Sequence, residues 1–126
     1  MQRYKRREGT RVIAIRLDLD TPGLTYQKWG KQQRANRGDW LVQSRDDVYT
    51  VAAETFGRTY RQVGPGQYEK ATDVWVRRAD EPGVIPTLEG ATTYEAGDYL
   101  VFNDEAGTDG YAMARSKFEE LYEIVE

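Results

Sequence analysis

The sequence contains no cysteine and no histidine among its 126 residues. Without cysteine the chain has no disulfide, no thiolate zinc site and no cysteine nucleophile. Without histidine it lacks the usual general base near neutral pH and the commonest transition-metal ligand. These two absences exclude Ser-His-Asp, Cys-His and His-ligated metal chemistry. They favour a non-catalytic protein that uses no metal and no cofactor.

Long apolar runs are also missing. No stretch approaches the ~18 residues that a membrane span requires. The basic segment Met1–Arg7 is not followed by the apolar core of a signal peptide. We therefore expect a soluble, cytoplasmic protein with no membrane partner. A hydrophobic content of 39%, with 12% aromatic residues, is enough to build a compact core.

Charge is unevenly divided along the chain, although its net charge is only −3. Residues 1–61 carry 13 Lys or Arg and 7 Asp or Glu, whereas residues 62–126 carry 5 and 14. One interpretation is that the two halves attract each other, or that copies associate head to tail. The other is that the basic half binds an anion such as a nucleotide or a nucleic acid.

An internal duplication is the clearest pattern in the chain. The segment Gly38–Val42 (GDWLV) recurs as Gly97–Val101 (GDYLV), and further matches follow each copy in the same order. At a shift of 62 residues, the first-copy aromatic residues are Tyr49, Phe56 and Tyr60, and they match Tyr111, Phe118 and Tyr122. We infer two units, residues 1–63 and 67–126, joined by the linker Gly64–Gly66 within one globular body.

Each unit predicts about four or five strands and one short helix. Alternating apolar residues and turn residues place the strands of the first unit at 11–17, 24–29, 38–42, 48–51 and 61–63. The same reasoning places those of the second at 73–77, 84–88, 97–101, 111–113 and 123–125. The expected helices cover 53–60 and 116–122. This pattern predicts an α+β fold of two similar β-rich units related by pseudo-twofold symmetry.

The repeated residues have structural interpretations. Glycine permits a tight backbone turn, aspartate bonds nearby amides, and an aromatic residue opens the following strand. These are Gly38, Asp39 and Trp40 in the first copy and Gly97, Asp98 and Tyr99 in the second. Spacing of i and i+4 puts each Phe/Tyr pair on one helix face, where Phe56/Tyr60 and Phe118/Tyr122 would hold helix to sheet. For Tyr49 and Tyr111 we favour core packing over a place in a pocket wall.

The chain resembles the small bacterial and phage PGDYG-type proteins. The resemblance rests on Arg37–Trp40 and Ala96–Tyr99, on the Phe-x-x-x-Tyr endings, and on the start Tyr4–Arg7 leading into an apolar strand. The signature proline is absent from both copies. The resemblance covers nearly the whole chain and implies a bacterial or phage origin and a cytoplasmic location. It brings no activity that can be carried over.

One cluster is present in the first copy and absent from the second. It interleaves cations with aromatic residues, a composition that stacks bases and neutralises phosphates. Its members are Tyr26, Lys28, Trp29, Lys31, Arg34 and Arg37. We expect them to bind an anionic or nucleotide-like ligand, or a partner protein. The alternative for this cluster is a solvated hairpin with Tyr26 and Trp29 packed inward, and the basic segment Arg3–Arg7 either adds to its surface or forms a charged tail.

Two other functions stay open on the sequence. The basic half could bind nucleic acid, and Asp39 with Asp98 could form an acid/base pair in a small carboxylate-dependent enzyme, although turn capping explains both residues. Self-association through an exposed strand edge would give a homodimer. The acidic stretches at 46–47 and 104–109 lack the ligand pattern of a calcium loop and are expected to be solvated hairpin tips.

Overall fold

The protein is mostly β, so the predicted α+β class is wrong. In the computed structural model, which describes residues 1–126, strands make up 52% of the chain and helices 11%. Two facts explain the difference. Each helix has only seven residues. Strands also form where none was expected, at β1 (Gln2–Arg6), β4 (Lys31–Asn36), β8 (Gln67–Lys70) and β11 (Ala91–Tyr94).

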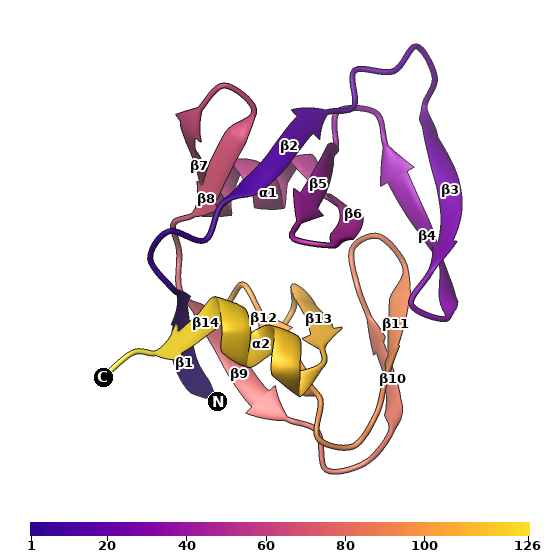
Figure 1. Cartoon of the computed structure of the whole chain (residues 1–126). Coiled ribbons are helices and arrows are strands. Elements are labelled where there is room, and N and C mark those ends of the chain that lie inside the picture. The colour runs from indigo at the N-terminus through magenta and orange to yellow at the C-terminus, as the bar shows by residue number, and fades with distance from the viewer.

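Two five-stranded antiparallel sheets form the body of the molecule (Figure 1). The first has the order β6-β5-β2-β8-β7 and carries α1. Its further elements are β2 (Val12–Arg16), β5 (Trp40–Ser44), β6 (Asp47–Val51), α1 (Ala53–Thr59) and β7 (Tyr60–Gly64).

The second sheet repeats this arrangement in the order β13-β12-β9-β1-β14 and carries α2. Its further elements are β9 (Val74–Arg78), β12 (Tyr99–Phe102), β13 (Gly110–Met113), α2 (Arg115–Leu121) and β14 (Tyr122–Ile124). Each position in this order has a counterpart in the first sheet, and β1 occupies the place that β8 holds there.

The first strand of each sequence unit lies in the sheet of the other unit. Strand β1 is inserted between β9 and β14, with Tyr4 opposite both Val74 and Ile124. Strand β8 is inserted in the same way between β2 and β7. The basic segment Arg3–Arg7 is therefore neither a charged tail nor part of the hairpin surface, because most of it is an internal strand of the second sheet.

Equivalent aromatic stacks anchor the two helices. The rings of Trp40 and Phe56 are stacked with centroids 4.1 Å apart, and those of Tyr99 and Phe118 are stacked at 4.4 Å. Phe56 then stacks on Tyr60 at 4.7 Å. Phe118 repeats this contact in the second unit, at 4.9 Å from Tyr122. Each helix is short, so its position depends on this stacking more than on helix propensity.

The two Gly-Asp turns have the same geometry. Gly38 and Gly97 have φ angles of 89° and 92°, a region that favours glycine. In each turn the aspartate Oδ2 accepts a hydrogen bond from a backbone amide three residues earlier. The distance is 2.8 Å for Asp39 and 2.9 Å for Asp98. Asp39 also accepts from the amide of Ala53 at the start of α1, at 3.0 Å.

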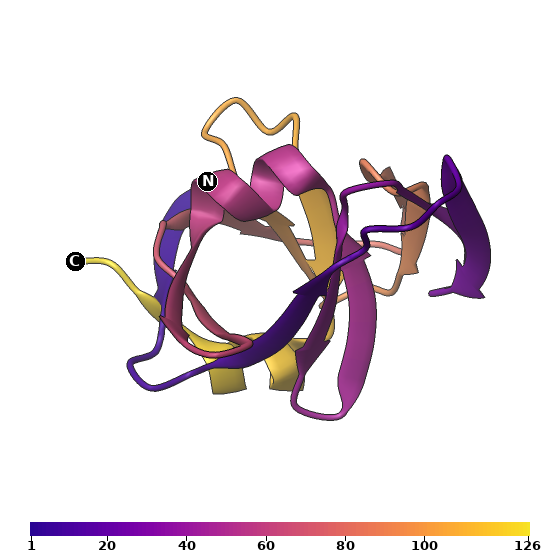
Figure 2. The same cartoon turned by 90° about the horizontal axis from the view of Figure 1, so that it is seen from above.

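Two hairpins project from the same side of the molecule, as the view in Figure 2 makes clear. They are β3 (Gly23–Lys28) with β4, and β10 (Gly83–Pro86) with β11. The first hairpin turns through Trp29 and Gly30, whose φ angles of 54° and 77° are those of a type I′ turn. The backbone oxygen of Trp29 accepts hydrogen bonds from the amide and the hydroxyl of Thr93, so the hairpins are joined directly.

Neither helix is long and apolar enough to cross a membrane.

Candidate functional site

A cavity of about 340 Å³ lies between the two sheets. Side chains of both units line it, from β1, β6, β8, β13, the hairpins and both helices. At one end, which we call the crossover end, the connections β1–β2 and β8–β9 pass from sheet to sheet (left in Figure 1). At the other, the hairpin end, β3–β4 and β10–β11 cover the gap between the sheets. The volume of the whole cavity lies in the range of sites that bind small molecules.

Two cations, Arg6 and Lys70, line the crossover end. They are the last residues of β1 and β8, which hold the same place in the strand orders of the two sheets. Neither forms an ion pair with a carboxylate. The Nε and Nη1 atoms of Arg6 are shielded from solvent and make no hydrogen bond. Lys70 is 8% exposed, and its Nζ donates to the Tyr111 hydroxyl at 3.1 Å.

Four tyrosines surround these cations. The guanidinium of Arg6 lies 5.0 Å from the ring centre of Tyr122, and Lys70 Nζ lies 5.9 Å from that of Tyr60. The hydroxyls of Tyr111 and Tyr122 are 3.0 Å apart and form one hydrogen bond. Tyr49, the counterpart of Tyr111, completes the set along the same wall. Arg6, Tyr122, Tyr111 and Lys70 thus form a continuous chain of contacts.

The cations change the acidity of one tyrosine in particular. Burial alone would raise the pKa of Tyr122, but the positive charges of Lys70 and Arg6 outweigh it and lower that pKa to about 7. Burial and the neighbouring Tyr122 instead raise the pKa of Tyr111 well above its usual range. Burial likewise raises the pKa of Tyr49 and of Tyr60. The Tyr111–Tyr122 pair therefore holds one acidic proton beside two cations.

Hydroxyls and carboxyls line the hairpin end. The threonines there are Thr50, Thr87, Thr92 and Thr93. Glu89, in the turn between β10 and β11, accepts a hydrogen bond from the Ala52 amide at 3.1 Å. Burial raises the pKa of Glu89 to about 7, and the negative charges of Asp109 and Asp39 add to this effect.

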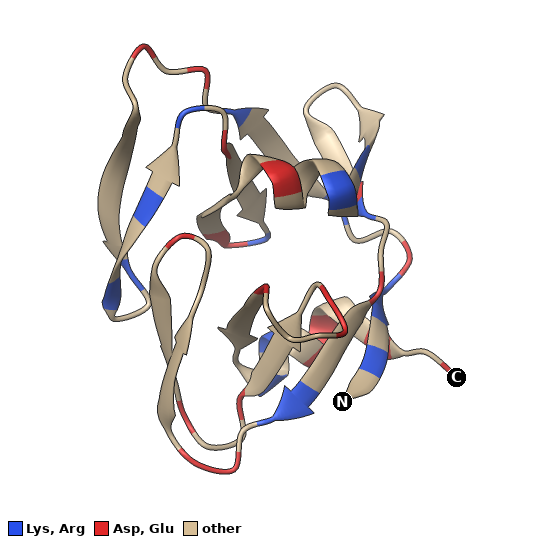
Figure 3. Cartoon of the chain, turned by 180° about the vertical axis from the view of Figure 1, so that it is seen from behind, with Lys and Arg blue, Asp and Glu red and all other residues tan.

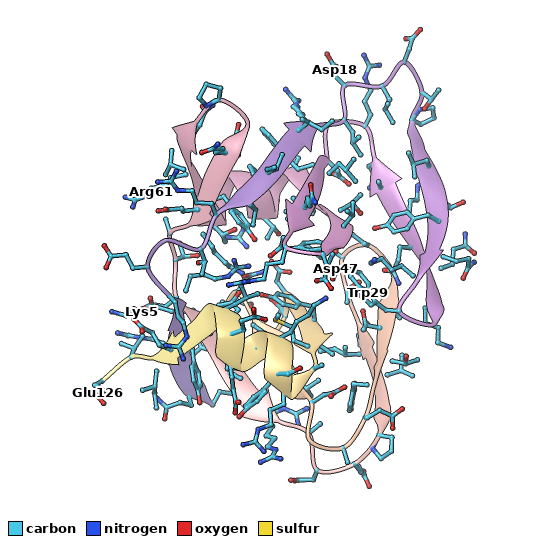
Figure 4. All side chains as sticks on the ribbon, viewed as in Figure 1. Lys5, Asp18, Trp29, Asp47, Arg61 and Glu126 are labelled. Atoms are coloured by element: carbon cyan, nitrogen blue, oxygen red, sulfur yellow. The ribbon has the colours of Figure 1, made fainter.

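Only one of the six residues predicted to bind a ligand lines this cavity. That residue is Trp29, at the hairpin tip, whose ring centre lies 6.0 Å from that of Tyr49. Lys28 pairs with Asp47 at 2.8 Å, and the Tyr26 hydroxyl is hydrogen-bonded to Thr50. Figure 4 labels Trp29 and Asp47, which lie between the two sheets on the hairpin side.

The other three predicted residues, Lys31, Arg34 and Arg37, are exposed and lie outside the cavity wall. The structure therefore divides the predicted cluster. Its aromatic tip faces the cavity, and its remaining cations face solvent on the hairpin.

Most basic residues of the first half contact carboxylates of the second half. Seven of the 13 do so within 4.0 Å, among them Arg3 with Asp73, Arg7 with Glu123 and Arg58 with Asp109. Figure 3 shows basic positions distributed among acidic ones on both sheets. Since exposed pairs of this kind contribute little to stability, their main effect here is to neutralise the basic half locally.

The sequence predictions missed Arg6 and Lys70. Both end a short pattern of tyrosine, one residue and a cation, in Tyr4–Arg6 and Tyr68–Lys70. The pattern recurs at a shift of 64 residues, whereas the rest of the duplication aligns at 59 to 62, so it lies outside the aligned segment. A search for repeats that allowed this longer shift would have found it.

No group of three or more Asp and Glu side chains is arranged to hold a metal ion. Comparison of the chain with family models, characterised proteins and solved structures found no match.

Proposed function

We propose that the protein is a non-catalytic binding module that takes a small anionic ligand into the cavity between its two sheets. The observation that carries this proposal is the pair Arg6 and Lys70, two cations in one cavity with no carboxylate partner. We also propose a cytoplasmic location, because the resemblance to PGDYG-type proteins implies one.

Electrostatics favour an anion at this position. A buried cation without a partner is costly, because the interior solvates charge less well than water does. Two such cations, one from each sheet, in the same cavity increase that cost by mutual repulsion. A carboxylate or phosphate beside Arg6 would accept hydrogen bonds from its guanidinium group and would offset the repulsion.

The tyrosine hydroxyls suit the same ligand. Tyr49, Tyr60 and Tyr111 stay protonated near neutral pH, since burial raises the pKa of each. A protonated phenol can donate a hydrogen bond to an anionic oxygen. The cavity lies between the two sheets and has a volume of about 340 Å³, which fits a small molecule. Nucleic acid, the alternative proposal, would instead need the exposed cations of hairpin β3–β4.

A thermal-shift and calorimetric comparison tests the proposal. We expect inorganic phosphate or a small carboxylate to raise the melting temperature of the wild-type protein in a concentration-dependent way. Arg6→Gln and Lys70→Gln should each weaken that binding by roughly ten-fold or more, because each removes one charge-assisted hydrogen-bond donor. Lys31→Gln, which removes an exposed cation outside the cavity, is the matched control and should bind like the wild type.

Two results would contradict the proposal. One is that no anion stabilises the wild-type protein. The other is that Lys31→Gln weakens binding as much as Arg6→Gln does, which would move the site to the hairpin surface. Salt-sensitive retention on DNA or RNA that is lost in Lys31→Gln, and kept in Arg6→Gln, would favour the nucleic-acid alternative.

A further inference from the structure

The cavity has a second polar region that the anion does not explain. It lies toward the hairpin end and contains Glu89, Asn103 and Asp109. Asn103 and Asp109 are joined by a hydrogen bond of 3.4 Å from Asn103 Nδ2. The charge of Asp109 also lies close enough to Glu89 to affect its ionisation. Asn103 and Asp109 are thus joined directly, and Glu89 lies in the same cavity wall, within the electrostatic influence of Asp109.

Within this region, Asp109 is already neutralised by its neighbours. Its Oδ2 accepts a hydrogen bond from Thr55 Oγ1 at 2.9 Å and pairs with Arg58 Nη2 at 3.3 Å. Its negative charge and hydrogen-bonding capacity are thus used within the protein.

Glu89 has no such cation. Its Oε2 accepts from the Ala52 amide at 3.1 Å, and no lysine or arginine forms an ion pair with the carboxyl. Burial, with the negative charges of Asp109 and Asp39, raises the pKa of this carboxyl. An amine placed against the carboxyl would provide the charge that the protein does not.

Asn103 provides a free acceptor. Its Oδ1 is shielded from bulk solvent and receives no hydrogen bond, although Asn103 lies in the cavity wall. Buried amide oxygens are rarely left without a donor. The cavity thus has a cation without a carboxylate partner at Arg6, a carboxyl without a cation at Glu89 and an amide oxygen without a donor at Asn103.

From this opposition we infer that the ligand is a small acid with a hydrogen-bond-donating group, an amine or a hydroxyl, at its far end. Its anionic group lies against Arg6 and Lys70, and its donor lies against Glu89 and Asn103. The inference rests on the proposed function, because it assumes that the cavity binds an anion.

Straight-chain acids provide a matched test by calorimetry on the intact protein. The probes are butanoate, pentanoate and hexanoate, each beside the derivatives with a terminal amine or hydroxyl and beside the dicarboxylate of the same length. We expect the best donor-bearing acid to bind at least about ten-fold more tightly than its parent acid. Three chain lengths are used because the separation of the two polar groups in a flexible ligand depends on its length.

Variants locate the effect. Glu89→Gln should remove most of the advantage of the amine and should not weaken binding of the parent acid, because it removes a negative charge from the cavity. Asn103→Leu should reduce the advantage of the hydroxyl acid. Glu95→Gln, on the same hairpin but outside the cavity wall, is the control and should behave like the wild type in all titrations.

The outcomes separate the inference from the proposed function. Equal binding of parent and donor-bearing acids, or tighter binding of the dicarboxylate, overturns the inference and leaves the anion site intact. If no organic acid binds but inorganic phosphate does, the inference again fails alone. If no anion of any kind binds, the proposed function fails with it. Tighter binding of the hydroxyl-bearing acid than of the amine-bearing acid supports the inference and shows that the donor group of the ligand is neutral.

Discussion

Tyr122 is the residue whose chemistry depends most on its neighbours. It is 1% exposed, it stacks on Phe118, and its hydroxyl is bonded to Tyr111. A buried tyrosine without cations nearby has a raised pKa, because ionisation would place a charge in the protein interior. Here two cations reverse that direction. The phenolate of Tyr122 is then the counter-charge that the protein itself can supply to Arg6 and Lys70.

This gives a spectroscopic prediction. Ultraviolet difference absorbance should show one phenol of the wild-type protein ionising near pH 7, the pKa of Tyr122. The transition should be absent in Tyr122→Phe. It should shift to higher pH in Arg6→Gln or Lys70→Gln, since each removes positive charge that favours the phenolate. Tyr94→Phe, outside the cavity, should leave it in place. A wild-type protein with no phenol ionising below pH 9 would contradict this account of the site.

The affinity of the cavity for an anion should depend on the protonation state of Tyr122. Below the pKa of Tyr122 the phenol is neutral, and above it the phenolate repels an incoming anion and competes for the same cations. Phosphate or carboxylate affinity should therefore fall as pH rises through about 7. In Tyr122→Phe this part of the pH dependence should disappear. An affinity that rises over this range in the wild type, beyond the change in phosphate ionisation, would count against the assignment.

At the scale of the element, the two Gly-Asp turns allow an internal comparison. Both aspartates accept an amide in their own turn, but only Asp39 also bonds the start of its helix. Asp39 is buried at 6% exposure, whereas Asp98 is half-buried. The same motif therefore connects turn to helix in one unit and serves the turn alone in the other.

Replacing each aspartate by alanine should reveal this difference. Asp39→Ala leaves two partly buried hydrogen bonds unmade, those from the Asn36 and Ala53 amides, and should lower the free energy of unfolding by about 2–3 kcal/mol. Asp98→Ala should cost only about 1 kcal/mol, since it removes one more exposed hydrogen bond. Urea denaturation of both variants measures the comparison. Equal losses would show that the bond to the Ala53 amide contributes nothing.

The elements also show which parts of the fold could be predicted from the sequence. Alternating apolar residues identify β2, β5, β9 and β12, because their inward faces are hydrophobic. Strands β1, β4 and β8 were missed because their buried positions include Arg6, Gln33 and Lys70, so no apolar alternation marks them. Polar inward groups obscured these strands, and two of those groups, Arg6 and Lys70, also build the candidate site.

At the scale of the whole molecule, the exchange of first strands could not be deduced from the repeat. Either copy of a duplicated strand fits geometrically into either sheet. Charge favours the observed pairing, because Arg3, Lys5 and Arg7 on and beside β1 contact Asp73 and Glu123 of the second half. The uneven charge along the chain thus agrees with the way the halves are joined.

Separated halves should consequently need each other. We expect the fragments 1–65 and 66–126 to be largely unfolded or self-associated alone, because each sheet would lack an internal strand. Mixed, they should form a folded one-to-one complex, which circular dichroism and native mass spectrometry would detect. The double change Arg3→Glu and Lys5→Glu should weaken that complex. A folded monomer from either fragment alone would show that the exchanged strand is dispensable.

The pairing of β1 with β14 has a mechanical consequence. The strands are antiparallel, with Tyr4 opposite Ile124, so both chain ends emerge at the same end of the pair. Tension applied between the termini would break the backbone hydrogen bonds of this pair one after another, which is the geometry of least resistance. The pull would first peel away the edge strand β14, which carries Tyr122, because β1 is also paired with β9. Under load the cation pair would therefore lose Tyr122 before Arg6 moves.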